Sequence, residues 1–141
     1  MTKRSDIANR LSDVKLFKHC TKGDLRIVAR HAEITTAAEG STVIRQGDHG
    51  DAFFLLLSGR ATIERDGVTV GQLGPGDWFG ELALLDPAPR AATITVQSDA
   101  ELAVLGTRMF RVLLRELPAL ATALLASLAR QARNAGSVDH A

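Results

Sequence analysis

Between residues 34 and 105 the chain alternates between short apolar runs of β type and clusters of Gly, Asp and Pro. Many short strands at regular spacing, with no long helical pattern between them, predict a β-sandwich or small barrel and argue against a parallel α/β sheet. The six runs read S-T-V-I-R, A-F-F-L-L-L, A-T-I-E-R, V-T-V-G-Q-L, A-T-I-T-V and L-A-V-L.

Helical patterns precede this region. We expect one helix over residues 5–11 and a second after Thr21, where Asp24 completes a loose capping box. The apolar positions that we expect to face the core here are Leu16, Phe17, Leu25, Val28 and Ala29.

Two further helices are predicted after the β region. Thr107 is expected to cap a helix that runs to about Glu116, and Pro118 suits the first turn of another that runs to about Arg133. The apolar stripe of the last helix would contain Leu117, Leu120, Ala121, Leu124 and Leu128, widened by Leu113 and Leu125.

One hairpin can be placed in register. Asp66-Gly67 is a strong signal for a two-residue turn, which pairs Glu64 with Thr69 and Ile63 with Val70. Ile63 and Val70 would then lie opposite each other and form an apolar platform on the inner face. Ordinary core packing is the alternative interpretation.

Length, charge and cysteine content narrow the class of protein. The 141 residues suit one domain with a real core, and the net charge of +1 gives no general attraction to DNA or anionic membranes. Any anion binding must therefore come from a local site. The single cysteine, Cys20, excludes an intramolecular disulfide and fits a cytoplasmic protein. The longest apolar tract, residues 117–129, is too short to span a bilayer.

Residues 79–93, F-G-E-L-A-L-L-D-P-A-P-R-A-A-T, place one Glu and one Arg in an apolar segment. A short helix beginning near Gly80 would present free backbone N–H groups, which form an anion site. Arg90, just after the helix, would contact the same anion. Glu81 accepts hydrogen bonds only, which suits hydroxyl groups. Together with an apolar platform for a base, these features describe a nucleotide pocket. A Glu81–Arg90 ion pair that merely closes a loop is the alternative.

This segment resembles the phosphate-binding cassette of cyclic nucleotide-binding domains, found in catabolite activator proteins, protein kinase A regulatory subunits and gated channels. The similarity extends to V-I-R-Q-G-D-H-G-D, L-L-L-S-G-R-A and G-P-G-D-W-F-G-E, and covers roughly residues 11–130. It implies a mainly β fold: an eight-stranded antiparallel β-roll of jelly-roll type, with N-terminal helices, a short cassette helix and two C-terminal helices.

The resemblance also implies roles for individual residues. Arg90 would hold the exocyclic phosphate oxygens, and Glu81 would accept the ribose 2′-hydroxyl, with Gly80 allowing close approach. The base would lie on Ile63 and Val70, and Leu120, Leu124 or Leu128 would cap it. The remaining ligand-binding positions, mainly backbone amides at the phosphate, are Leu82, Ala83, Ala91 and Ala92. Members that prefer cGMP often have Thr where this chain has Ala91, so the resemblance favours cAMP as the regulatory ligand.

We therefore expect a non-catalytic sensor whose C-terminal helices move when cyclic nucleotide binds. One domain would span residues 1–141, with N-terminal helices over 1–33, the β-roll over 34–105, C-terminal helices over 106–134 and a frayed tail over 135–141. With no helix-turn-helix visible, direct DNA binding is not expected. The output would be an unidentified effector protein, an output domain absent from this chain, or a homodimer. A ligand-free scaffold or dimerisation module on the same fold is the alternative.

Other chemistries have weaker support in the sequence. A cupin-type metal enzyme would need clustered ligands, whereas His19, His31, His49 and His140 are scattered, and no metal is expected. Cys20 beside His19 is a weak indication of a nucleophile. The acidic residues and glycines of Q-G-D-H-G-D fit turn geometry better than a calcium site.

Overall fold

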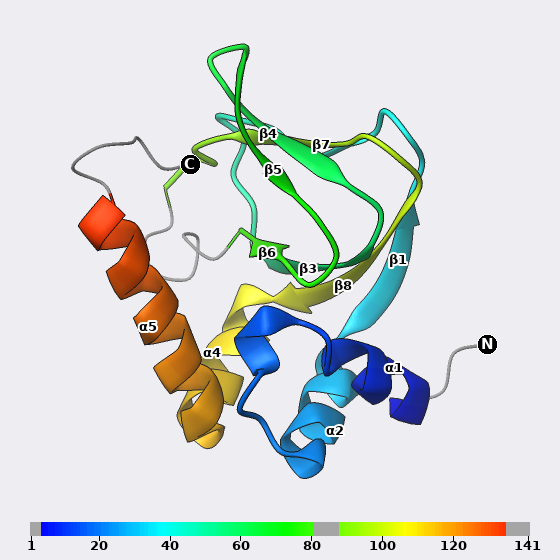
Figure 1. Ribbon diagram of the computed structural model, residues 1–141, viewed down its shortest axis with the longest axis vertical. Coiled ribbons are helices and arrows are strands. Elements are labelled where there is room, and N and C mark those ends of the chain that lie inside the picture. Colours follow the sequence, from blue (N-terminus) through cyan, green and yellow to red (C-terminus); the bar gives the residue numbers. More distant parts are fainter. Residues whose placement is uncertain (1–3, 81–87, 135–141) are drawn as a thin grey trace.

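The computed structural model describes residues 4–80 and 88–134. In that part of the chain, two four-stranded antiparallel sheets form a β-roll, and helices pack against one of the sheets (Figure 1). The molecule thus has three layers: the helices, the sheet β1-β8-β3-β6 and the sheet β2-β7-β4-β5. The predicted mainly β fold of jelly-roll type with flanking helices is confirmed.

The sheet nearer the helices contains two strands that our list of runs omits. Its members are β1 (Glu33–Ala37), β8 (Ala100–Gly106), β3 (Ala52–Ser58) and β6 (Trp78–Phe79). Strands β1 and β6 are the omitted pair. Residues along β3 alternate between its two faces: Phe53 and Leu55 pack against the helices, whereas Phe54 and Leu56 face the second sheet.

The second sheet matches the predicted runs closely. Its members are β2 (Thr42–Ile44), β7 (Thr93–Val96), β4 (Ala61–Arg65) and β5 (Val68–Leu73). Asp66 and Gly67 form the turn between β4 and β5, with φ of 53° and 80°, as a two-residue turn with both residues in the left-handed region requires.

The predicted hairpin register is correct next to this turn and wrong beyond it. Glu64 pairs with Thr69 as expected, but Ile63 pairs with Gly71, because the register shifts between Ile63 and Glu64. A β-bulge at Val70 accounts for the shift, since two residues of one strand then oppose one residue of the other. Val70 therefore does not lie opposite Ile63.

The N-terminal helices follow the predicted pattern. They are α1 (Arg4–Leu11), the 3₁₀ helix η1 (Lys15–Phe17) and α2 (Lys22–His31). Thr21 is the N-cap of α2, and its capping box is complete: the Thr21 hydroxyl accepts from the Asp24 N–H at 3.0 Å, and the Asp24 carboxylate accepts from the Thr21 N–H at 3.1 Å. The five apolar positions expected to face the core are all buried.

The C-terminal helices α4 (Thr107–Glu116) and α5 (Pro118–Asn134) have the predicted extents. The predicted cap is wrong: Gly106 is the N-cap of α4, and Thr107 is its first helical residue. Leu125 is also misassigned, because it is 67% exposed and lies off the buried stripe of Leu117, Leu120 and Leu124. The tail predicted over residues 135–141 lies outside the described residues.

No single described helix is long and apolar enough to cross a membrane. The helices α4 and α5 pass that test of length and composition only as a pair, and the pair is bent by 112° at its break.

Candidate functional site

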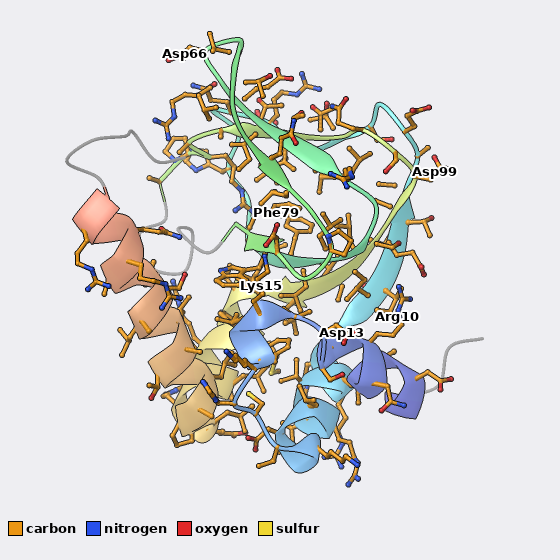
Figure 2. The ribbon with its side chains drawn as sticks, in the orientation of Figure 1. Arg10, Asp13, Lys15, Asp66, Phe79 and Asp99 are labelled. Carbon is orange, nitrogen blue, oxygen red and sulfur yellow. The ribbon has the colours of Figure 1, made fainter. Side chains whose placement is uncertain are left out.

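Strand β6 delivers Gly80 to one end of the β-roll. Phe79 pairs with Phe54 of β3, and their rings stack with centroids 5.0 Å apart, which holds β6 in the interior (Figure 2). Gly80 follows with φ of 89°. A Cβ at Gly80 would lie 3.0 Å from the Ala52 carbonyl oxygen and 3.1 Å from Arg90 Nη1. The positive φ favours glycine here, and the close contacts add to that preference.

Arg90, which follows the predicted cassette helix in sequence, places its guanidinium beside Gly80 and Ala52. The residue is only 8% exposed. Its Nη2 donates a hydrogen bond to the Ala52 carbonyl at 2.8 Å, and its Nη1 donates to the Gly80 carbonyl at 3.2 Å. The guanidinium is thus held against backbone at the start of β3 and at the end of β6.

The backbone of Gly50 also lies against this guanidinium. A Cβ at Gly50 would lie 2.6 Å from Arg90 Nη2 and 2.8 Å from Arg90 Nε, closer than atoms can approach. The side chain of Arg90 therefore packs directly on the Gly50 backbone. We name the backbone of Gly50, Ala52 and Gly80 around this guanidinium the arginine cradle.

The loop before β3 also holds the backbone of Arg90. The Arg90 N–H donates to the Asp48 carbonyl at 2.8 Å, and the Gly47 N–H donates to the Arg90 carbonyl at 2.9 Å. The same loop reaches α4, because the Thr107 N–H donates to the Asp51 carbonyl at 2.7 Å. Segments far apart in sequence thus converge on residues 47–52.

The structure brings together Gly80 and Arg90 from the predicted set. Ala91 and Ala92 follow directly, with Ala91 exposed and Ala92 buried. Glu81, Leu82 and Ala83, together with the predicted cassette helix, lie outside the described residues. The alternative of an ion pair between Glu81 and Arg90 involves Glu81 and therefore also lies outside the described residues.

The apolar platform is less regular than predicted. Ile63 is partly buried and packs against the core between the two sheets, whereas Val70 is 47% exposed at the bulge. Gly71 takes the position opposite Ile63, and a Cβ there would lie 3.3 Å from Ile63 Cδ1. The inner face near Ile63 is therefore shaped by a glycine.

The residues proposed to cap the base belong to the helical layer in this arrangement. Leu120 and Leu124 lie in the core formed by the helices and the outer side of β3 and β8, and Leu128 packs against it partly buried.

Two parts of the arginine cradle are not predicted from the sequence. The sequence indicates only a turn residue at Gly50 and only the first residue of a strand at Ala52. The second glycine of Q-G-D-H-G-D was the available signal for Gly50. A backbone carbonyl such as that of Ala52 leaves no trace in residue identity.

In residues 4–80 and 88–134, the structure supports neither a cysteine nucleophile nor a metal site. Burial, and to a smaller extent Asp24, raises the pKa of the Cys20 thiol, which is the opposite of what a reactive nucleophile needs. No group of three or more His, Cys, Asp or Glu residues in these ranges could hold a metal ion.

A hollow of about 390 Å³ lies elsewhere, around the turn between β7 and β8, and contains none of the predicted ligand residues. Its walls are Thr36, Ala37, Ala38, Ser58, Asp99, Ala100 and Glu101.

Comparison with known proteins gives a consistent result. Residues 34–116 match the family described as the cyclic nucleotide-binding domain. The cAMP-dependent protein kinase regulatory subunit of Aspergillus niger is 52% identical over 77 residues, which are 53% of this chain and 19% of that protein. The corresponding subunit of Mucor circinelloides f. lusitanicus is 41% identical over 108 residues, 74% of this chain and 25% of that protein. The chain thus spans about a fifth to a quarter of these relatives.

Solved structures show the same similarity. A cAMP-bound PfPKA-R structure superposes with a TM-score of 0.84 at 30% identity, over 95% of this chain and 46% of that chain. The Thermus thermophilus catabolite activator protein superposes with a TM-score of 0.81 at 33% identity, over 86% of this chain and 60% of that chain.

Proposed function

The chain belongs to the cyclic nucleotide-binding domain family, and we propose that it is a non-catalytic sensor that binds cAMP in preference to cGMP. The observation that carries the proposal is the arginine cradle, which holds Arg90 beside Gly80 at the start of the cassette. The relatives named as cAMP-dependent regulatory subunits support cAMP as the ligand.

Arg90 would bind the cyclic phosphate. Burying a guanidinium costs free energy, because water no longer solvates the charge, and a bound anion would lower that cost. The two carbonyl contacts already fix the position of the guanidinium, so little side-chain entropy would be lost on binding. The amides of Leu82, Ala83, Ala91 and Ala92 would complete the phosphate site.

The sugar and base would occupy the neighbouring surfaces. Glu81 would accept a hydrogen bond from the ribose 2′-hydroxyl, with Gly80 allowing close approach. Ile63 and Val70 would contact the purine, and binding would cover the exposed part of Val70. Ala91 offers no hydroxyl for a guanine amino group, which favours adenine.

Ligand binding would be coupled to α4 through the start of β3. The Ala52 carbonyl accepts from Arg90, and the Asp51 carbonyl accepts from Thr107 at the start of α4. Phe53 then stacks on Phe110 of α4 with ring centroids 4.3 Å apart. A change at Arg90 would therefore act on α4 and on α5, which is joined to it. The ligand can shift this arrangement only by binding two states with different affinity.

The output would be a partner protein or a second copy of the chain, in the cytoplasm. The related proteins are regulatory subunits, which supports control of an effector.

Isothermal titration calorimetry with cAMP and cGMP in parallel tests the proposal. We expect binding of both and tighter binding of cAMP. Arg90→Ala should weaken cAMP binding at least about tenfold, because hydrogen bonds to a charged group contribute about 1.5–3 kcal/mol each. Arg26→Ala, at an exposed position on α2, is the matched control and should bind as the wild type does.

Two results would contradict the proposal. Absence of binding to either nucleotide by the folded wild-type chain would favour the ligand-free scaffold. Unchanged affinity in Arg90→Ala would remove the assigned role of the cradle.

A further inference from the structure

The side chain of Gln46 holds the tip of the β4–β5 hairpin. Its Nε2 donates a hydrogen bond to Asp66 Oδ1 at 2.9 Å, and its Oε1 accepts one from the Asp66 N–H at 2.8 Å. Asp66 lies at the tip of the hairpin (Figure 2) and has a positive φ of 53°, which a residue with a Cβ adopts at some cost. The two hydrogen bonds stabilise this conformation from outside the hairpin.

The backbone around Gln46 is attached to the other half of the candidate site. The Gln46 N–H donates to Thr93 Oγ1 at 2.9 Å, which fixes the loop to β7. The next two residues, Gly47 and Asp48, exchange hydrogen bonds with the backbone of Arg90. One short segment, residues 46–48, therefore contacts both the hairpin tip and the residue proposed to bind phosphate.

We propose that Gln46 is a positioning residue, which sets the hairpin that would contact the purine relative to Arg90. The inference rests on the proposed function, since the two ends of one cyclic nucleotide would occupy these two elements. Gln46 would not touch the ligand. It would act by limiting motion of a hairpin whose outer part, including Val68 and Val70, is exposed and lies at the edge of its sheet.

The chemistry of the pair calls for an amide. Gln supplies one donor and one acceptor, and both are used on Asp66. A Glu at position 46 would keep the acceptor for the Asp66 N–H but would place a carboxylate against the Asp66 carboxylate. Replacing Asp66 by Asn as well would supply a side-chain amide N–H, which can donate to the carboxylate at position 46. The pair can therefore be broken and rebuilt with nearly isosteric changes.

The test is a double-mutant cycle of Q46E, D66N and Q46E/D66N, with cAMP affinity measured by calorimetry and hydrogen exchange of the Asp66 amide measured by NMR. We expect Q46E to weaken cAMP binding about fivefold and to speed exchange at Asp66, because one hydrogen bond is replaced by a repulsive contact. The double variant should return to within about twofold of wild-type affinity and recover slow exchange. D66N alone keeps an oxygen facing the Gln46 amide and supplies the fourth corner of the cycle.

The outcomes separate this inference from the proposed function. Wild-type cAMP binding with equal affinity in Q46E would overturn the positioning role while leaving the sensor intact. Recovery of slow exchange at the residue 66 amide in the double variant without recovery of affinity would also overturn it, since the contact would then be structural only. If the wild-type chain bound neither cyclic nucleotide, the proposed function would fail and the positioning role with it, whereas the exchange data would still report the contact.

Discussion

At the scale of single residues, Arg90 is a charged side chain that is buried in the protein interior. Its guanidinium packs on the backbone of Gly50 and donates to two carbonyls. Side chains at positions 50 or 80 would occupy the space that the guanidinium uses. The absence of a Cβ at these two positions therefore leaves the space that the guanidinium occupies.

Gly50→Ala tests this packing. The new Cβ would lie 2.6 Å from Arg90 Nη2, so the guanidinium must move away from the Ala52 carbonyl. We expect cAMP affinity to fall several-fold and the free energy of unfolding to fall by about 1–3 kcal/mol, as for other overpacked sites. Gly74→Ala is the matched control, because a Cβ there meets nothing within 4 Å. Equal affinity in the two variants would show that the position of the guanidinium does not matter.

The sequence predicts the side chains of this site better than its backbone. Arg90 and Gly80 stand out because a charged residue and a glycine occur in an apolar segment. The Ala52 carbonyl could not be predicted, since every residue has a carbonyl and only the tertiary fold decides which one faces Arg90. Gly50 is an intermediate case. The sequence shows that the residue is glycine, but only the fold shows that it packs against Arg90.

At the scale of elements, helix ends and strand registers depend on local rules to different degrees. The capping box of α2 was predictable because Thr21 and Asp24 satisfy each other within one turn. The bulge at Val70 was not, since it places an extra residue in a strand whose alternation looks regular. Strand β6 has two residues, too few for any pattern.

Thr21→Ala measures how much the cap of α2 contributes. The Asp24 N–H would lose its acceptor, and we expect the free energy of unfolding to fall by about 1 kcal/mol. For a chain of this size that corresponds to a decrease in Tm of about 3 °C. Thr21→Ser keeps the hydroxyl and should retain most of the stability. A loss as large in Thr21→Ser would assign the effect to the methyl group.

At the scale of the whole molecule, charge is unevenly distributed. Residues 34–105 contain ten acidic and four basic residues, whereas the flanking helical regions are basic. The proposed anionic ligand would thus approach a β-roll of net negative charge. The contacts proposed at Arg90 would have to outweigh that repulsion for a cyclic nucleotide to bind.

The helical layer and the β-roll are also joined by an ion pair. Arg10 of α1 donates to both carboxylate oxygens of Glu101 on β8, at 3.0 Å each, and both side chains are partly exposed. The hydrogen bonds from Arg10, and to a smaller extent its charge, lower the pKa of Glu101, while desolvation opposes them. The pair connects residues 91 positions apart in the chain.

This ion pair predicts a pH-dependent contribution to stability. Because the pKa of Glu101 is lowered on folding, its contribution is present at neutral pH and is lost as the pH falls through the acidic range. E101Q should lower the free energy of unfolding at pH 7 by about 0.5 kcal/mol, a value typical of partly exposed pairs. Urea unfolding at pH 7 and in mild acid should show the difference from wild type shrinking in acid. A difference for E101Q that stays constant with pH would contradict the assignment.

The carbonyls of Asp51 and Ala52 belong to adjacent residues, yet one accepts from α4 and the other from Arg90. The two carbonyls belong to consecutive peptide planes, which are joined at the Cα of Ala52. Only the two torsions of Ala52 separate these contacts, so a change at one carbonyl can be passed to the other without any intervening side chain. Substitutions that separate ligand affinity from helix movement should accordingly be rare in the hydrophobic interior and concentrated at this one joint.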